Sequence, residues 1–319
     1  MSDPSAGYGV ELDTALIGPA PAPRKLVTKY RAETRAAYVF LTPWMIGMVV
    51  IVAIPMVGSL YLSFTNYNLL QAPEWVGVEN YVRLFQDPRY LKALGVTVTY
   101  VGVSVPLQLA FALLLAMALN RGLRGLVFYR GAFYLPSLIG ASVAIAILWR
   151  NIFGTAGIVN AALGFFGLET KSWISDPRTA LGTLILLNVW TFGAPMIIFL
   201  AGLRQIAQVY YDAASVDGAG PVRQFLHITF PLLTPIIFFN LVLQVITAFK
   251  AFTQAFVISG GSGGPADSTL IYSVYFYSEG FVNFRMGYAS AMAWILIAIV
   301  GTLTAANFLL SKYWVHYEE

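Results

Sequence analysis

The sequence predicts an all-α, polytopic membrane protein with six transmembrane helices, and two observations carry that prediction. Of the 319 residues, 58% are hydrophobic and only 11% are charged, whereas a soluble domain usually has about 25% charged residues. Six long stretches of the chain also contain no charged residue. About 20 mostly apolar residues are enough for a helix to cross the roughly 30 Å hydrocarbon core of a bilayer. This composition argues against a disordered chain, a nucleic-acid binder and most soluble enzymes.

Each empty stretch is long enough for one membrane-spanning helix. The charge-free stretches cover residues 36–73, 93–120, 131–149, 179–203, 224–249 and 286–311. The helices predicted from them cover residues 38–64, 93–119, 128–152, 180–203, 232–256 and 288–311, and none contains Asp or Glu. Six buried core helices of this length would leave a soluble protein with little polar surface. We therefore place all six in a membrane.

The segment before the first helix, residues 1–35, is predicted to be a disordered cytoplasmic tail because of its Pro-rich run at 18–23. The first helix does not resemble a cleaved signal peptide, since it follows this tail, is too long and lacks a small-residue cleavage site. The transmembrane domain is therefore assigned to residues 36–312. Pro106 and Pro195 are expected to kink the second and fourth helices, with neighbouring groups satisfying the freed backbone.

The distribution of Lys and Arg predicts the orientation of the helices. If the N-terminus is cytoplasmic, eleven of the 19 Lys and Arg residues fall in inside segments and six in outside segments. Arg150 and Lys250 lie near span ends and are left out of this comparison. The positive-inside rule then places both termini in the cytoplasm. The short loop that carries Arg121 and Arg124 is the clearest local case.

The loop between the fourth and fifth helices, residues 205–231, is predicted to form two short helices joined by a glycine turn. Gly218 and Gly220 can adopt positive φ, and Pro221 suits the first turn of a second helix. Leu226 and Phe230 are four residues apart and so share one helix face. The result is a compact, partly apolar knuckle suited to docking into another protein. From the residues alone, an amphipathic connector that rests on lipid headgroups fits equally well.

The same loop carries the motif by which the chain resembles a known family. The string Asp212-Ala213-Ala214, three residues, Gly218, nine residues and Ile228-Thr229-Phe230-Pro231 is similar to the EAA loop of ABC importer permeases, Glu-Ala-Ala-x3-Gly-x9-Ile-x-Leu-Pro. Asp stands for Glu at 212 and Phe for Leu at 230, and the spacing is kept throughout. Further segments resemble the carbohydrate-uptake branch and its MalF/UgpA-type subunit: 63–65, 76–81, 200–203, 264–265 and 287–291.

The resemblance implies a fold, partners and a set of site residues. The fold would be the MetI-like ABC type-1 permease core, in the cell membrane of a bacterium. The loop would be the coupling helix that sits in a cleft of a cytoplasmic ABC ATPase dimer. Its contact residues would be Asp212, Ala213, Ala214, Asp217, Gly218, Ala219 and Gly220. The other partners would be a second permease subunit of the MalG/UgpE-like type and an extracytoplasmic solute-binding protein. Together they would translocate a sugar, or a related polyol or glycerol phosphate, by alternating access.

The sequence offers no catalytic residues, metal site or cofactor site that would make the chain an enzyme. Cys is absent, which excludes disulfides, zinc–thiolate sites, iron–sulfur clusters and Cys nucleophiles. The two His residues, His227 and His316, cannot build a multi-His metal site. A phosphate-binding G-x-x-x-x-G-K-[ST] loop is also absent, so an ATP-driven protein would need its ATPase on another chain.

The predicted fifth helix carries four polar residues and one alanine at intervals of four, three, four and three, so they share one helix face. The members are Asn240, Gln244, Thr247, Ala251 and Gln254, with Lys250 beside them. Because polar side chains in a membrane usually face a bundle interior or an aqueous cavity, and amides and hydroxyls suit a sugar, we predict a substrate pathway here. Asn188 of the fourth helix is a further candidate. Hydrogen bonding between helices is the alternative, and Lys250 could instead snorkel, pair with a partner subunit or bind an anionic solute.

Two other classes of function compete with an importer subunit. An ion-coupled secondary transporter usually carries inverted repeats and intramembrane acids, and the sequence shows neither. An intramembrane enzyme would need a nucleophile–base pair or a metal cluster, for which the predicted spans hold no His, Cys or carboxylate. An ATP-driven sugar permease subunit is therefore the favoured prediction.

Overall fold

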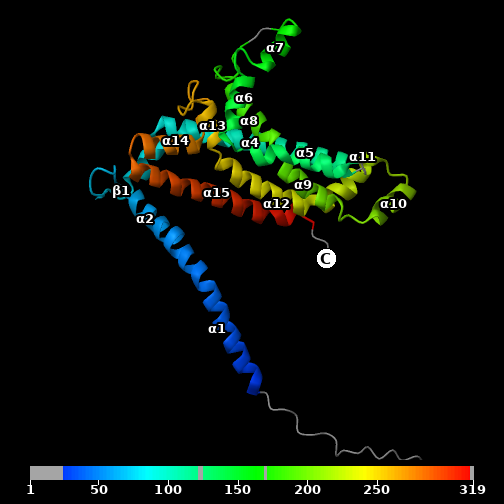
Figure 1. Cartoon of the computed structure of the whole chain (residues 1–319), viewed down its shortest axis with the longest axis horizontal. Coiled ribbons are helices and arrows are strands. Elements are labelled where there is room, and N and C mark those ends of the chain that lie inside the picture. The colour runs from blue at the N-terminus through cyan, green and yellow to red at the C-terminus, as the bar shows by residue number, and fades with distance from the viewer. Residues whose placement is uncertain (1–23, 121–124, 169–170, 317–319) are drawn as a thin grey trace, which may run out of the picture. The chain divides into compact units, whose positions relative to one another are not determined.

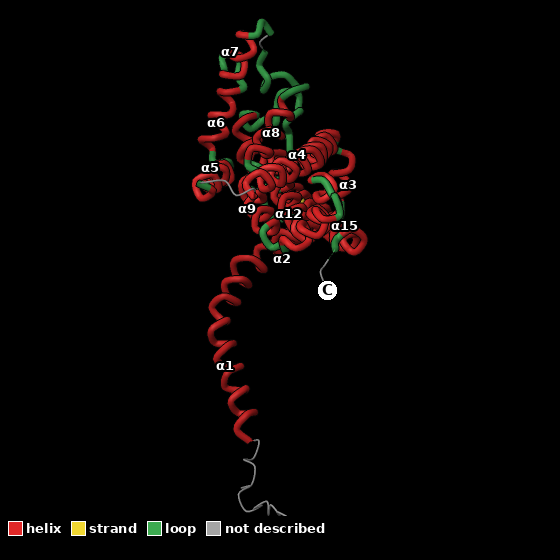
Figure 2. Tube along the Cα trace, turned by 90° about the vertical axis from the view of Figure 1, so that its right-hand side faces the viewer, coloured by secondary structure: helices red, strands yellow, loops and turns green. Residues whose placement is uncertain are grey.

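A computed structural model describes residues 24–120, 125–168 and 171–316 of the chain. These residues are helical almost throughout, apart from loops and one short antiparallel pair of strands, β1 (Thr65–Asn66) and β2 (Glu74–Trp75) (Figures 1 and 2). The chain divides into two compact units, residues 1–58 and 59–319. Each unit is described on its own below.

The first unit is a helical segment without a loop in its described part. It consists of α1 (Arg24–Gly47), the π-helix η2 (Met48–Ala53) and the start of α2 (Ile54–Ser63), which runs on into the second unit. The predicted tail is therefore helical from Arg24 onward, because no proline follows Pro23 until Pro43 and more than half of the intervening residues are Ala, Leu, Lys, Arg or Glu, which are good helix formers. The rest of that tail, residues 1–23, lies outside the described residues.

The second unit is built around α4 (Pro88–Asn120), a helix of 33 residues that packs against α8 (Ala180–Trp190), α9 (Gly193–Leu203) and α12 (Phe230–Phe249). One face of α4 is buried at intervals of three and four residues, so it forms the centre of the core. Its buried apolar members include Val101, Val105, Leu109, Ala112 and Ala116. The final helix, α15 (Met286–Trp314), lies beside α12 (Figure 1).

Four helical segments in the described part of the chain are long and apolar enough to cross a membrane. They are Ala36–Ser63, Pro88–Asn120, Pro221–Ile258 and Met286–Trp314. Two bent helix pairs bring the number to six when each pair is taken as one span. The chain is thus an all-α, polytopic membrane protein, as predicted.

The predicted third helix, 128–152, is broken rather than continuous. It consists of α5 (Leu126–Ile139) and α6 (Val143–Ile152), which meet at 97°. The Ser142 hydroxyl accepts a hydrogen bond from the Ile145 amide at 3.3 Å and so caps α6. At the bend, a Cβ on Gly140 would lie 2.3 Å from the Thr191 side chain. The break therefore follows from a cap and from a close approach that only glycine permits.

The predicted fourth helix, 180–203, bends by 42° between α8 and α9. Pro195 has no amide hydrogen, so the Thr191 carbonyl four residues earlier is left free. That carbonyl accepts hydrogen bonds from Gln108 Nε2 at 3.1 Å and from Ser137 Oγ at 2.8 Å. The expectation that neighbours satisfy the backbone around Pro195 is confirmed.

The predicted fifth helix, 232–256, also differs from a single rod. The helix α12 ends at Phe249, and α13 (Thr253–Ile258) begins only after Lys250, Ala251 and Phe252. The Ser273 hydroxyl, at the start of α14 (Tyr272–Tyr277), donates to the Ala251 carbonyl. Because this contact comes from elsewhere in the chain, the local pattern could not show the break.

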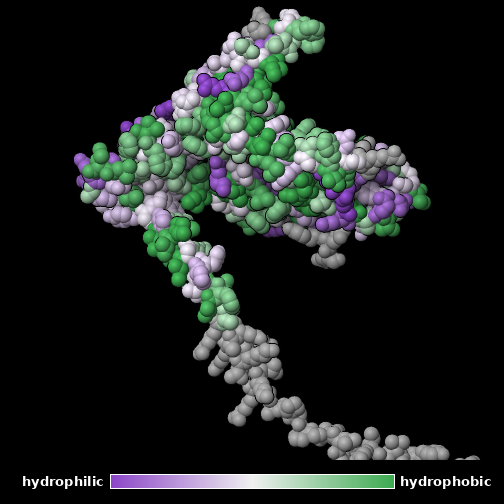
Figure 3. Space-filling view, viewed as in Figure 1, coloured by the Kyte–Doolittle hydropathy of each residue, from purple (hydrophilic) through white to green (hydrophobic). Residues whose placement is uncertain are grey.

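Short helices complete the second unit at its two ends. At the start of α4 lie α3 (Glu79–Gln86), α14 and the π-helix η4 (Ser278–Val282). The helix α7 (Ile158–Phe165) follows α6. Toward the start of α12 lie α10 (Gln208–Val216), α11 (Pro221–Gln224) and the π-helix η3 (Phe225–Thr229). Hydrophilic side chains gather in the region of α10 and α11 in Figure 3.

Candidate functional site

The second unit holds a polar cavity of about 540 Å³ among otherwise apolar helices. Six of the seven residues predicted for a substrate pathway line it: Asn188, Gln244, Thr247, Lys250, Ala251 and Gln254. The break after α12 places Lys250 and Ala251 in a non-helical segment and Gln254 on α13. The predicted stripe from Asn240 to Gln254 therefore does not lie on one continuous helix, yet the break still brings four of its five members, with Lys250, to one cavity.

Asn240 is the predicted pathway residue that does not line this cavity. It is fully buried, and its Nδ2 donates to the Ile236 carbonyl at 3.2 Å within the same helix. Its Oδ1 has no hydrogen-bond partner among the described residues. Asn240 thus lies inside the protein rather than on the cavity wall.

Sequence reasoning missed the opposite wall of the cavity. That wall is contributed by α4, α5 and the α8–α9 bend, through Tyr100, Gln108, Ser137, Thr191 and Ala194. The available signals were a single amide in the apolar second helix and a threonine four residues before Pro195. The cavity is completed by Phe252 and Thr253 at the break after α12.

Hydrogen bonds hold the polar groups of this missed wall in place. Gln108 Nε2 donates to both the carbonyl and the Oγ1 of Thr191, each at 3.1 Å, and Gln108 Oε1 accepts from Asn188 Nδ2 at 3.4 Å. The Ser137 hydroxyl donates to the Thr191 carbonyl and accepts from the Ala194 amide at 2.9 Å. These bonds fix where amide and hydroxyl groups present themselves to a ligand.

The cavity is well suited to an uncharged or singly anionic polar ligand. None of its described lining residues is Asp or Glu, and one, Lys250, is a cation. Lys250 makes no ion pair within the described part of the chain. The other polar groups are amides and hydroxyls, which both donate and accept hydrogen bonds, and Phe252 adds an aromatic face.

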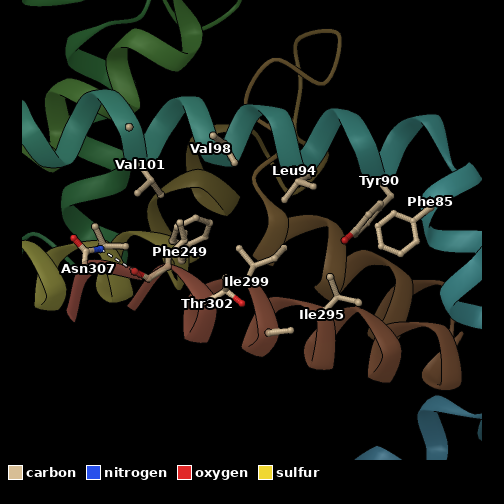
Figure 4. A pocket seen from close by; sticks show the side chains of 14 residues that line it. Phe85, Tyr90, Leu94, Val98, Val101, Phe249, Ile295, Ile299, Thr302 and Asn307 are labelled. Carbon is tan, nitrogen blue, oxygen red and sulfur yellow. Dashed lines mark hydrogen bonds between the residues drawn. The ribbon is translucent and has the colours of Figure 1, made fainter. Parts of the chain in front are cut away.

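A larger cavity of about 680 Å³ lies between α4, α12 and α15. Figure 4 shows its wall of Leu94, Val98, Phe249, Ile295 and Ile299, which is almost wholly apolar. A hydrated solute would lose its hydrogen bonds to water there without replacement. The smaller polar cavity is therefore the candidate ligand site.

The loop 205–231 forms the second part of the candidate site, here called the helical knuckle. Its first helix, α10, ends in a Schellman cap in which the Ala219 amide donates to the Ala214 carbonyl at 2.8 Å. Gly218 holds the left-handed position of this cap with φ 77°. Gly220 precedes Pro221 at the start of α11, as the sequence predicts, but its φ of −71° is not left-handed.

Side-chain bonds fasten the two helices of the knuckle together. Gln224 Nε2 donates to the Ala219 carbonyl at 3.1 Å and to Ser215 Oγ at 3.0 Å. The hydroxyls of Tyr211 and Thr229 share a hydrogen bond of 2.9 Å. Asp212 Oδ1 accepts from Gln208 Nε2 at 3.1 Å on the outer side of α10. The knuckle is thus a folded unit with its own internal bonds.

The outer face of the knuckle is open to contact. Asp212, Ala213, Asp217, Gly218 and Gly220 are exposed, whereas Ala214 and Ala219 are partly buried. Large apolar side chains of the knuckle are also solvent-exposed: Val209, Tyr210, Val216, Val222 and Leu226, with Val216 88% exposed. An apolar surface of this kind usually marks an interaction site. Part of the knuckle also encloses a cavity of about 370 Å³ with Met117 and Asn120 at the end of α4.

The described residues contain no cluster of three or more His, Cys, Asp or Glu side chains that could hold a metal ion. The chemistry of the polar cavity is accordingly that of hydrogen bonding and one positive charge. The knuckle offers a shape and an apolar face. The two features are thus a polar cavity among apolar helices and an exposed, partly apolar knuckle.

Comparisons with known proteins agree on what kind of membrane protein this is. Residues 85–313 match the family described as "Binding-protein-dependent transport system inner membrane component". The probable ABC transporter permease protein YesP of Bacillus subtilis is 54% identical over 290 residues, covering 90% of this chain and 94% of that protein. The sn-glycerol-3-phosphate transport system permease protein UgpA of Brucella abortus is 34% identical, with 88% and 96% covered. The lactose transport system permease protein LacF of Rhizobium radiobacter is 32% identical, with 86% and 93% covered.

A solved structure shares the fold. A chain of a bacterial ABC transporter involved in the import of the acidic polysaccharide alginate aligns with a TM-score of 0.74 at 24% sequence identity, covering 90% of this chain and 98% of that one. The sequence matches and the shared arrangement of helices assign the chain to the same family. The chain belongs to the binding-protein-dependent transport system inner membrane components, the permeases of ABC importers, in their carbohydrate-uptake branch of the MalF/UgpA type.

Proposed function

We propose that this chain is the membrane-spanning subunit of an ATP-driven importer that moves a mono- or oligosaccharide, or a related polyol or glycerol phosphate, into the cytoplasm by alternating access. The observation that carries this proposal is the polar cavity inside an apolar helix bundle. Its fixed amides and hydroxyls can replace the water bound to a sugar. The residues proposed to contact solute are Asn188, Gln244, Thr247, Lys250, Ala251 and Gln254.

The knuckle is proposed to couple this pathway to ATP hydrolysis on a separate ATPase chain. Its exposed apolar face and the order imposed by the cap at Gly218 support this role. The proposed contact residues are Asp212, Ala213, Ala214, Asp217, Gly218, Ala219 and Gly220. In the proposed orientation the knuckle and both termini are cytoplasmic, which the distribution of Lys and Arg favours.

The other proposed partners are a second permease subunit of the MalG/UgpE-like type and an extracytoplasmic solute-binding protein. The family description itself speaks of binding-protein-dependent transport. Relatives are named for the transport of glycerol 3-phosphate and lactose. Those names support a solute with several hydroxyl groups, with or without one negative charge.

Reconstitution in proteoliposomes tests the proposal. The chain is combined with the second permease subunit, the ATPase and the binding protein encoded with it, and uptake of radiolabelled sugars and glycerol 3-phosphate is measured. We expect uptake to require ATP on the side of the membrane where the ATPase lies. The uptake rate should saturate as the concentration of binding protein on the opposite side is raised. Replacing both Gln108 and Gln244 by Leu should abolish uptake while the complex still assembles, because the cavity loses its central amides.

Two results would contradict the proposal. Uptake that continues without ATP but stops when a protonophore is added would indicate an ion-coupled transporter instead. Uptake that is unaffected in the double Leu variant would show that the solute takes another route through the membrane.

A further inference from the structure

A third polar cavity, of about 490 Å³, lies at the start of α4. Arg83, Arg89 and Arg285 line it together with the carboxylates of Asp87 and Glu279, and it is here called the arginine cavity. With a rise of about 1.5 Å per residue, Arg89 and Asn120 are roughly 45 Å apart along α4. This separation exceeds the roughly 30 Å hydrocarbon core, so the arginine cavity and the knuckle face opposite sides of the membrane.

The acidic groups of the arginine cavity already have their hydrogen bonds. Asp87 Oδ2 accepts from the hydroxyls of Tyr275 at 2.5 Å and Tyr288 at 2.7 Å, while its Oδ1 accepts from the Arg89 amide at 2.9 Å. Burial alone would raise the pKa of Asp87, but these bonds outweigh it and hold that pKa below its usual value. Glu279 accepts from Arg285 Nη1 at 3.0 Å and Asn283 Nδ2 at 2.9 Å.

The arginines, in contrast, have N–H donors that make no hydrogen bond within the described part of the chain. Arg89 uses its Nε and Nη2 on Asp267, at 3.2 and 3.0 Å, and on the Ser262 carbonyl. The Arg285 side chain donates through Nη1 alone, and the Arg83 side chain makes no hydrogen bond or ion pair within the described part of the chain. The Arg83 guanidinium lies 5.5 Å from the ring centre of Tyr288. A guanidinium has five N–H donors, so the cavity is complementary to a carboxylate.

The surroundings of the cavity suit a protein partner. The side chains of Arg89 and Arg285 are 45% and 52% exposed, so a neighbouring surface can reach them without any opening of the fold. Exposed apolar residues stand within two positions of the cavity's arginines or Glu279 in the sequence: Val82, Phe85, Phe281 and Phe284. Exposed arginine and aromatic side chains in the same short segments are typical of protein–protein interfaces.

The distance from the polar cavity also favours a protein over free solute. Tyr100 is the first residue of α4 that lines the polar cavity. It lies about 16 Å along the helix from Arg89. An anion held at the arginine cavity would therefore lie outside the polar cavity. A carboxylate on a docked protein can bind at the arginine cavity without entering the polar cavity.

We infer that the arginine cavity receives an acidic side chain of the extracytoplasmic solute-binding protein, with Arg83 as its main contact. The inference rests on the proposed function and orientation, because it needs a binding protein on the side opposite the knuckle. Arg89 links the cavity to the glycine-rich loop of residues 260–264 through Ser262, and to Asp267 just after it. Docking at Arg83 therefore takes place beside a loop that is tied to the same cavity.

The test titrates the reconstituted importer with the solute-binding protein that supports its uptake. Arg83→Gln should raise the binding-protein concentration for half-maximal uptake about tenfold, since a central interface arginine typically carries that much affinity. The maximal rate should stay within about twofold, because Arg83 lies outside the polar cavity. The control is Arg178→Gln, an exposed arginine outside the arginine cavity that makes the same change in charge.

A charge exchange identifies the partner. Arg83→Glu should abolish uptake at the concentration that half-saturates the wild type, and one Asp→Arg or Glu→Arg variant of the binding protein should restore it. Because the Arg83 side chain is exposed and makes no hydrogen bond or ion pair in the described structure, its variants should fold, which gel filtration of the complex verifies.

Failure of the inference is distinguishable from failure of the proposed function. A wild-type assembly that shows no ATP-dependent and binding-protein-dependent uptake would overturn the proposed function. A wild type that transports, with Arg83→Gln and Arg178→Gln giving the same half-saturating concentration, would overturn the inference alone. So would an Arg83→Gln effect that disappears when anionic phospholipid is omitted from the vesicles, since the arginine would then serve a lipid headgroup.

Discussion

Lys250 is the residue that we expect to decide which solutes the polar cavity accepts. It sits in the break between α12 and α13 and has no ion-pair partner among the described residues. A cation within a low-dielectric bundle attracts an anion strongly, and it tolerates a neutral ligand only while water solvates it. The amides around it bind hydroxyl groups in either case.

We expect Lys250→Gln to separate these two kinds of solute. If the transported solute carries a carboxylate or phosphate, the variant should reduce uptake at low solute concentration by about tenfold or more, because a charge-assisted bond is lost. A neutral sugar should be affected by less than about threefold, since glutamine still offers hydrogen bonds. Uptake of glycerol 3-phosphate and of lactose by the reconstituted importer measures both. Equal losses for the two would contradict a role in charge recognition.

Asn240 is expected to matter for packing and not for solute. Its Oδ1 is buried without a partner among the described residues, and such an atom costs roughly 1–3 kcal/mol of stability. Asn240→Leu should therefore leave uptake within about twofold of the wild type and keep or raise the melting temperature of the purified complex. Gln244→Leu, one turn further along α12 and on the cavity wall, is the matched variant that should lose uptake. A loss with Asn240→Leu of the same size would place Asn240 in the pathway.

Prolines explain much of the helix geometry at the scale of single elements. The π-helices η2 and η3 both end two residues before a proline, Pro55 and Pro231. Since a proline removes one amide and crowds the carbonyl four residues earlier, the widened turn accommodates the mismatch. At Pro195 the freed Thr191 carbonyl is taken by Gln108 and Ser137 instead. The same bonds order the wall of the polar cavity, so a helix defect positions part of the candidate site.

The cap at Gly218 makes a clear prediction for the knuckle. An Ala there would keep φ near 77°, which costs a residue with a side chain about 1 kcal/mol. Gly218→Ala should therefore lower uptake about fivefold by loosening the knuckle. Gly218→Asn is the matched variant and should lose less, because asparagine adopts the left-handed conformation more readily than alanine and an added Cβ at this position has nothing within 4 Å. Uptake and ATPase activity are measured together, and equal effects of the two variants would contradict the role of the cap.

Helices could be predicted from the sequence much better than the breaks within them. Stretches without charged residues predict membrane spans because a charge is costly in lipid. This signal can be read from each segment by itself. The bend of the fourth helix could be expected from Pro195, whereas the breaks at Gly140 and Ala251 involve side chains that lie elsewhere in the chain. For the same reason the polar face of α12 revealed one wall of the cavity, whereas Gln108 and Ser137 on the opposite wall could not be placed.

For the molecule as a whole, α4 is the element that relates the three polar regions to one another. It contributes Arg89 to the arginine cavity, Gln108 to the polar cavity and Asn120 to the cavity beneath the knuckle. Along the helix, Gln108 lies roughly 28 Å from Arg89 and about 18 Å from Asn120. The polar cavity is thus well inside the membrane, and a solute there must reach one side or the other by movement of the helices around it.

Alternating access predicts that the polar cavity opens to one side at a time. Because the chain has no Cys, Thr247→Cys supplies a unique thiol on the cavity wall. In the reconstituted importer, a membrane-impermeant maleimide should label it from one side in the resting complex and from the other after trapping with ATP and vanadate. Arg178→Cys and His316→Cys, both exposed, are controls that should react only from outside and only from inside, in either state. Labelling of Thr247→Cys from both sides in one state would indicate an open channel, and reversed labelling of the controls would overturn the proposed orientation.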